Sequence, residues 1–233
     1  MKHLYISILL FLLPLACLAQ GPDEVFTDFF SWKETLRYAT GKDTVTLTTK
    51  PGNETYFLVA ARADGTRAME ADMDVIYDTV PGFVIPQYCM QSCSVRDGQA
   101  ADRYIYEWTT PLQAQFRYFP DEVPEDLSAY PFRKVGNGNG VFDPLMVMTR
   151  LRRGGSLFDI TGATVVFHGK SYYLNYIQCA PGYVGDIIVY RYTVNLSEKS
   201  YIKLTVETDG YRRPMAFEIR IGDFKKKGRL IDE

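Results

Sequence analysis

The sequence is poor in the residues that most often carry catalysis or bind transition metals. It contains two histidines, His3 and His168, and four cysteines in 233 residues. Its 26 basic and 28 acidic residues nearly balance, which gives a formal net charge of -2. The strongly basic balance typical of nucleic-acid-binding proteins is therefore missing from the chain as a whole, and we expect no nucleic-acid partner. A hydrophobic content of 46% excludes a disordered acidic chain and suffices for one sizeable core.

Long apolar runs are also scarce, and the one that stands out, Leu4 to Ala16, lies at the N-terminus. It is shorter than the roughly 20 residues that span a bilayer. The sequence Cys17-Leu18-Ala19 then places small residues ahead of a cut before Gln20, which is typical of a cleaved secretory signal. We therefore expect residues 1–19 to be a signal peptide and residues 20–233 to form a single β-rich domain.

This leader predicts that the mature protein is exported to the periplasm or the medium and has no transmembrane segment. Lipidation of Cys17 is the less favoured alternative. A lipoprotein signal prefers leucine three places before the cysteine and a small residue at the next place, where this chain has Pro14 and Leu15.

Apolar and polar residues alternate with a period of two over much of the mature chain, for example over 44–49, 104–108, 202–207 and 215–221. This period is typical of half-buried β-strands. The gaps between the strands are too short for the crossover helices that parallel strands require, so the sheet is expected to be antiparallel.

One segment, residues 143–153, has a helical pattern instead. Asp143 suits the N-cap and Pro144 suits the first helical position, while Gly154 is placed to end the helix. The predicted fold is therefore all-β with one short helix: a strongly curved antiparallel sheet, or open half-barrel, wrapped around the helix near 143–153.

The size of this sheet predicts a pocket. About nine strands at ~4.8 Å each give a sheet roughly 40 Å wide, whereas the helix is only ~16 Å long. Because a soluble monomer does not leave so large an apolar face uncovered, the sheet must curl on itself, pair with another chain or hold an apolar ligand. We expect a partly open pocket, with a fully packed core as the equally weighted alternative. The candidate ligand-binding residues are Tyr104, Tyr106, Trp108, Phe167 and Phe217.

Removal of the leader leaves Cys89, Cys93 and Cys179. In an extended strand the Cα atoms of Cys89 and Cys93 would lie ~13 Å apart, farther than the ~7 Å that a disulfide allows. A Cys89–Cys93 disulfide therefore requires a turn or bend there. We expect that disulfide, with Cys179 buried and unpaired, while pairing of Cys179 with either cysteine is the competing connectivity. A zinc site that adds His168 matches no standard spacing, and neither a metal nor a cofactor is expected.

The remaining motifs predict little chemistry. His168 lies beside Gly169 in an expected surface turn without a nucleophile motif, and Asp72-Met73-Asp74 suits a solvated strand face. The loop 136–140 is rich in glycine but lacks the lysine of a phosphate-binding loop. Lys225–Lys227 would suit anionic lipid headgroups, although a solvated tail is the favoured interpretation. No catalytic residue is assigned.

The order of the elements can also be compared with known families. A strand near Tyr77-Asp78 leads to a turn at Phe83–Pro86, and a short helix begins at Phe142-Asp143-Pro144-Leu145. A final hairpin reads Asp209-Gly210-Tyr211-Arg212-Arg213-Pro214 before the strand Met215–Ile221. Over about residues 33–232, this order resembles the exported bacterial family known as domain of unknown function 3108. The resemblance implies a curved antiparallel sheet and an envelope setting, and it supplies no catalytic residues.

Two classes of function remain. The first is a non-enzymatic binding or carrier module of the bacterial envelope for an apolar or glycolipid-like ligand. The alternative is a hydrolase or transferase that acts on an envelope glycan or lipid through carboxylates brought together by the fold. A single mature histidine and the lack of a paired-carboxylate motif favour the first class. Two carboxyl groups ~5–9 Å apart in a cleft would favour a glycosidase.

Overall fold

The computed structural model describes residues 34–41, 43–50, 53–61, 67–80, 83–93, 102–110, 112–120, 124–126, 129–136, 139–152, 160–208 and 212–231. Between residues 53 and 93 the description covers the backbone and the side chains of Cys89 and Gln91. No helix in these ranges is long and apolar enough to cross a membrane.

The first half of the described chain is built of strands alone. These are β1 (Glu34–Thr40), β2 (Asp43–Lys50), β3 (Asn53–Ala61), β4 (Arg67–Val80), β5 (Phe83–Cys93), β6 (Arg103–Thr110), β7 (Gln113–Phe119) and β8 (Arg133–Val135). The second half adds β9 (Val141–Phe142), the helix α3 (Pro144–Arg152), β10 (Thr164–Phe167), β11 (Lys170–Val184), β12 (Ile187–Leu196), β13 (Tyr201–Glu207), β14 (Pro214–Ile221) and β15 (Phe224–Leu230).

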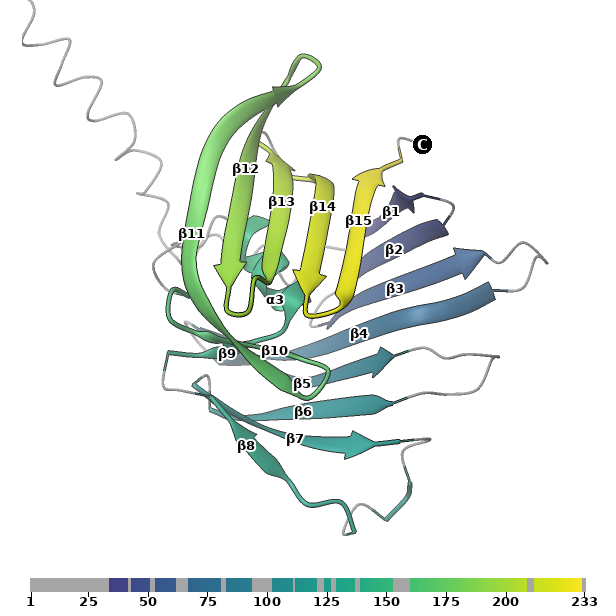
Figure 1. The fold of residues 1–233 in the computed structure, drawn as a ribbon, viewed down its shortest axis with the longest axis vertical. Coiled ribbons are helices and arrows are strands. Elements are labelled where there is room, and N and C mark those ends of the chain that lie inside the picture. The colour runs from purple at the N-terminus through teal and green to yellow at the C-terminus, as the bar shows by residue number, and fades with distance from the viewer. Residues whose placement is uncertain are drawn as a thin grey trace, which may run out of the picture.

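All strands belong to one 15-stranded sheet in the order β8-β7-β6-β5-β4-β3-β2-β1-β15-β14-β13-β12-β11-β10-β9. Neighbours are antiparallel except β9 and β10, which are parallel. Two meanders are thus joined where β1 pairs with β15, with Tyr38 opposite Leu230. The joint places the last strand of the chain in the middle of the sheet, beside the first described strand (Figure 1).

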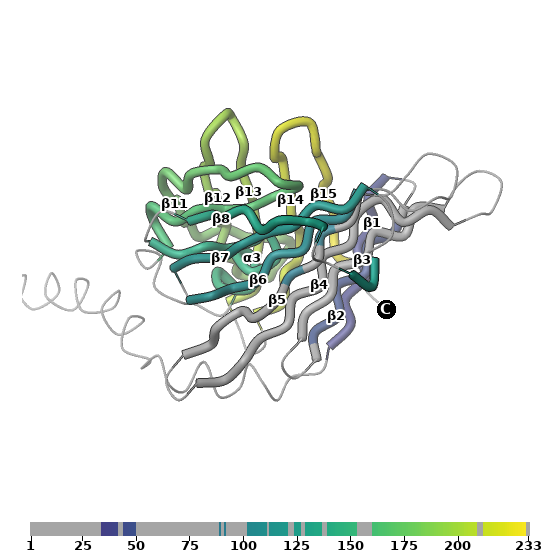
Figure 2. Tube along the Cα trace, turned by 90° about the horizontal axis from the view of Figure 1, so that it is seen from below, coloured from purple at the N-terminus to yellow at the C-terminus, as the bar shows by residue number. Residues whose placement is uncertain are grey.

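The sheet curls around α3, as predicted. Figures 1 and 2 show α3 between β11–β15 on one side and β5–β7 on the other. Most of the helix is buried, including Leu145, Val147 and Leu151, and it contacts β13 and β10. An apolar helix surrounded on nearly all sides is stable only inside a core, and the curled sheet supplies that core. The structure confirms an all-β half-barrel wrapped around a helix at the predicted position.

The two halves of the curled sheet are linked through side chains that reach from β5 and β6 to β10 and the turn after it. Gln91 of β5 donates from Nε2 to the carbonyl of Val166, 3.0 Å away, and accepts from the N–H of His168 at 2.9 Å. Its carboxamide therefore bonds the edge of β10 as a neighbouring peptide group would. On β6, the Tyr106 hydroxyl accepts from the N–H of Gly169 at 2.9 Å. These three bonds satisfy backbone groups that the short strand β9 does not reach.

The β11–β12 hairpin extends past the rest of the sheet (Figure 1). Beyond Leu174, the described strands pair with β11 only through β12, so the other side of β11 is a free edge. Pro181 has no N–H to offer on this strand. The guanidinium of Arg191 crosses Gly182 and donates to the carbonyl of Tyr183 at 2.9 Å. A proline and a side chain bonded to the edge both discourage the addition of a foreign strand.

Candidate ligand-binding site

Four of the five predicted ligand-binding residues pack against each other inside the curled sheet. Tyr106 is fully buried and Phe167 is nearly so, while Tyr104 and Trp108 are half-buried. The Tyr106 ring lies 6.5 Å from that of Trp108. His168 stacks on Phe167 at 3.8 Å and on Tyr104 at 5.7 Å. The interior side of these strands is thus filled by aromatic rings.

The fifth residue, Phe217, lies on the opposite wall. Its ring packs edge-on against Tyr38 with centroids 5.1 Å apart, and it is 4% exposed. It stands directly across from Gly228 on β15. A Cβ atom at Gly228 would lie 2.5 Å from Cε1 of Phe217 and 2.9 Å from Cβ of Tyr38. The glycine therefore makes room for the phenylalanine ring in the core.

The sequence left two interiors open, a partly open pocket and a fully packed core, and the described side chains can be compared with both. Tyr106, Phe167 and Phe217 belong to the described core, Tyr104 and Trp108 pack against it, and part of Phe217 also reaches a hollow. This hollow, of about 420 Å³, lies on the outer face of β13, β14, β15 and β1. The alternation of aromatic residues along the strands predicted the buried face correctly. That face is covered by α3 and filled by the aromatic rings themselves.

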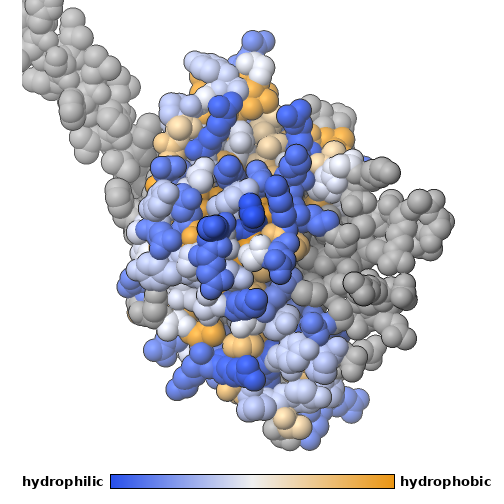
Figure 3. Space-filling model, in the orientation of Figure 1, coloured by the Kyte–Doolittle hydropathy of each residue, from blue (hydrophilic) through white to orange (hydrophobic). Residues whose placement is uncertain are grey.

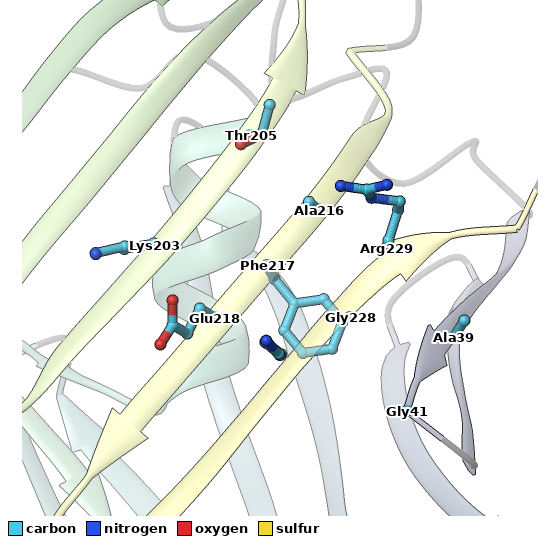
Figure 4. Close-up of a pocket in the computed structure, with 10 residues that line it drawn as sticks. Ala39, Gly41, Lys203, Thr205, Ala216, Phe217, Glu218, Gly228 and Arg229 are labelled. Carbon is cyan, nitrogen blue, oxygen red and sulfur yellow. The ribbon is translucent and has the colours of Figure 1, made fainter. Parts of the chain in front are cut away.

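The outer hollow lies where small residues stand on both sides of one strand. Ala216 of β14 and Ala39 of β1 both pair with Arg229 of β15, one on either side of it, and Gly228 precedes Arg229. Figure 4 shows Lys203 on one side of Ala216 and Arg229 on the other. Thr205, Glu218, Lys227, Gly41 and part of Phe217 complete the lining. The arrangement is a shallow depression in which small residues alternate with charged ones.

Among the described residues that line the hollow, Glu218 is the one acid. Its Oε1 accepts a 2.6 Å hydrogen bond from the Tyr201 hydroxyl and lies 3.9 Å from Nζ of Lys225. The Tyr201 hydrogen bond, together with nearby lysines, lowers the pKa of this carboxyl. Glu218 is therefore ionised near neutral pH and already engaged, so it is not a free proton donor.

The sequence concealed this surface because Lys225–Lys227 looked like a solvated tail. In the structure these residues belong to β15, which pairs with both β14 and β1. The available signal was the alternation of Lys225, Lys227 and Arg229, which places three cations on one face of a strand. Their position in the centre of the sheet depends on the β1–β15 pairing, which joins residues far apart in the sequence.

The predicted Cys89–Cys93 disulfide does not fit the backbone of this segment. Both residues lie in the continuous strand β5, without the required turn, and Cys89 is buried and forms no disulfide. The thiol donates to Oδ2 of Asp143 at 3.1 Å. Cys179 is free, as expected, but exposed rather than buried. An extended backbone holds residues four apart too far from each other to bridge.

Asp143 is the N-cap of α3, as predicted, but it is also fully buried. Its Oδ1 accepts from the N–H of Met146 at 2.6 Å, and its Oδ2 accepts from Cys89. Burial raises the pKa of Asp143 to about 6, although these hydrogen bonds oppose the shift. Tyr106 lies nearby, and burial raises the pKa of its hydroxyl as well. This polar cluster anchors the helix start to β5.

His168 is placed for packing rather than for nucleophilic catalysis. It occupies the predicted turn after β10 with φ 47°, and Gly169 follows with φ 74°. Positive φ at both central residues is typical of a type I′ hairpin turn. Burial lowers the pKa of the imidazole to about 4, so it is neutral at neutral pH. In the described ranges, no group of three or more His, Cys, Asp or Glu side chains is placed to hold a metal ion.

The Asp72-Met73-Asp74 motif lies on β4, but its side chains fall outside the described ones. Comparison of the chain with protein-family models, with curated proteins and with solved structures returns no match.

Proposed function

We propose that this protein is an exported, non-enzymatic binding protein whose ligand occupies the outer hollow. The observation that carries the proposal is the hollow itself. Its volume of about 420 Å³ lies within the roughly 300–1,000 Å³ of small-molecule sites. The N-terminal pattern of residues 1–19 and the resemblance to the exported domain of unknown function 3108 support the envelope setting.

The charged residues around the hollow favour binding over catalysis. Glycoside hydrolysis needs two carboxyl groups facing each other across the substrate. The described lining offers Glu218 alone, and that carboxylate is bonded to Tyr201 and lies near Lys225. The neutral, stacked His168 lies inside the sheet and does not line the hollow. We therefore keep the binding class of function and place the ligand outside the barrel.

The same lining refines the kind of ligand. Lys203, Lys227 and Arg229 line the hollow together with small alanine and glycine residues. A purely apolar molecule would gain little by displacing water from three cations. A glycolipid-like molecule suits the site better, because an anionic or hydroxyl-rich headgroup can meet the cations and lie flat on the small residues.

The test is to fill the hollow and ask whether a bound molecule is lost. Ala216→Trp places an indole in the hollow, and Gln113→Trp places the same side chain on the exposed strand β7, away from the site. We expect native mass spectrometry of protein purified from the envelope to show a bound molecule in the parent and in Gln113→Trp, and none in Ala216→Trp. The intact mass also reports the N-terminus, expected at Gln20.

Circular dichroism establishes that both variants are folded before the masses are compared. A parent protein that carries no molecule, or an Ala216→Trp variant that keeps it, would refute the proposed site. A lipid-modified Cys17 would refute release by signal-peptide cleavage.

A further inference from the structure

The outer face around the hollow is unusually rich in positive charge. Residues two apart on a strand share a face, so Lys225, Lys227 and Arg229 all lie on the outer face of β15. Neighbouring strands add further cations in register. Arg220 of β14 stands directly opposite Lys225, and Lys203 of β13 stands opposite Glu218. We refer to these residues as the cationic array: Lys203, Arg220, Lys225, Lys227 and Arg229.

The positive charge of the cationic array is not balanced by acidic residues on the same face of these strands. Glu218 lies between Lys203 and Lys227. Alternation also places Glu207 on this face of β13, but its carboxylate is buried and paired with the guanidinium of Arg213. The whole chain, by contrast, has a net charge of -2. In Figure 3 the face that carries these strands is covered largely by hydrophilic residues.

Such clustering opposes folding. Like charges directly opposite each other on neighbouring strands are destabilising, as for Arg220 and Lys225. A solvated face without a ligand would be more stable with acidic and basic residues interspersed. A bound anion would remove this repulsion, so the array is better explained by an anionic ligand than by solubility alone.

Two members of the array, Lys227 and Arg229, line the hollow from the same strand. Among the described residues, no carboxylate forms an ion pair with Lys227 or Arg229. The guanidinium of arginine can bind a phosphate group through two parallel hydrogen bonds, and a lysine acts as a mobile point charge. The Cα atoms of Lys227 and Arg229 are two residues apart on a strand and so lie roughly 7 Å from each other.

We infer that the hollow binds a ligand with at least two phosphate-type groups, one held by Arg229 and one by Lys227. The small residues of the hollow then accommodate the body that joins the two groups. This inference rests on the proposed function and names the ligand chemistry of the same site. The two groups can belong to a lipid headgroup or to a free phosphorylated sugar, and the experiment separates these sources.

Isothermal titration compares a hexose bisphosphate with the corresponding hexose monophosphate. Vesicle flotation compares phosphatidylcholine vesicles that contain diphosphatidylglycerol, with two phosphates, with vesicles that contain phosphatidylglycerol, with one. In at least one of these pairs we expect the two-phosphate probe to bind at least about tenfold more tightly, because each added phosphate meets its own cation. The pair that shows the difference identifies the source.

Variants locate the binding. Lys227→Gln and Arg229→Gln should each lower the affinity for the two-phosphate probe about tenfold and reduce the salt dependence of its binding. Lys134→Gln, on the exposed strand β8, is the matched control and should leave both unchanged.

Equal affinity for one and two phosphates, no binding by any probe, or binding that survives both variants would overturn the inference. If no phosphate probe binds while Ala216→Trp still removes a co-purifying molecule, this inference fails and the proposed function stands.

Discussion

Replacing Gln91 with leucine should weaken the closure of the curled sheet. The Gln91 side chain is fully buried and makes two hydrogen bonds across the gap to β10, one to the carbonyl of Val166 and one from the N–H of His168. Leucine has nearly the same size but neither a donor nor an acceptor. The substitution therefore removes both bonds and leaves two backbone groups without these partners.

The magnitude follows from these two groups. A buried backbone donor or acceptor that loses its partner costs about 1–3 kcal/mol. Because the same substitution unpairs one donor and one acceptor, the free energy of unfolding should fall by about 2–6 kcal/mol. A domain is commonly stable by only about 5–15 kcal/mol, so the midpoint of urea unfolding should move to a clearly lower concentration.

Urea denaturation followed by far-ultraviolet circular dichroism measures the effect, and Gln115→Leu is the matched control. Gln115 lies half-buried on β7, and its one recorded hydrogen bond is a long one of 3.4 Å to Glu107. Its substitution should cost less than about 1 kcal/mol. Gln91→Glu gives a second check. Its carboxylate cannot donate to Val166, but it regains a donor when protonated, so this variant alone should recover stability as the pH falls.

Equal losses for Gln91→Leu and Gln115→Leu would refute the reasoning, because they would show that the side-chain bridge between β5 and β10 does not stabilise the curled sheet.

Two further predictions concern the core. Gly228→Ala should cost about 1–3 kcal/mol by overpacking, since the new Cβ would lie 2.5 Å from the Phe217 ring and 2.9 Å from Tyr38; a thermal shift assay checks it, and an unchanged melting temperature would contradict it. The second prediction is that two buried groups give opposite pH dependences. The pKa of Asp143 is raised from 3.8 to about 6, so its contribution to stability is lost as the pH rises through that window. The pKa of His168 is lowered from 6.5 to about 4, so its contribution is lost as the pH falls through its own window. Between about pH 4 and 6 the two slopes, each at most ~1.4 kcal/mol per pH unit, oppose each other. In Asp143→Asn the free energy of unfolding should therefore rise with pH, because the His168 contribution remains. In His168→Asn it should fall with pH, because the Asp143 contribution remains. The same slope in both variants would contradict these two predictions.

The sequence by itself determined the local structure. Alternation identified the strands around Tyr104–Trp108 and Met215–Ile221, and Asp143-Pro144 marked the start of the helix that the structure confirms. The short gaps between strands correctly predicted a largely antiparallel sheet. These inferences succeeded because residue periodicity and cap chemistry act between residues that are close in the sequence.

The tertiary structure alone decided which surfaces are covered and which are open. The predicted ligand-binding residue Tyr106 lies fully buried in the core beside α3, whereas part of Phe217 reaches the outer hollow. Lys227 lies in the centre of the sheet because β15 pairs with β1, whose residues are nearly the whole described chain away. Periodicity shows which side chains share a face of a strand, whereas the exposure of that face depends on long-range pairing that the pattern of any one segment does not record.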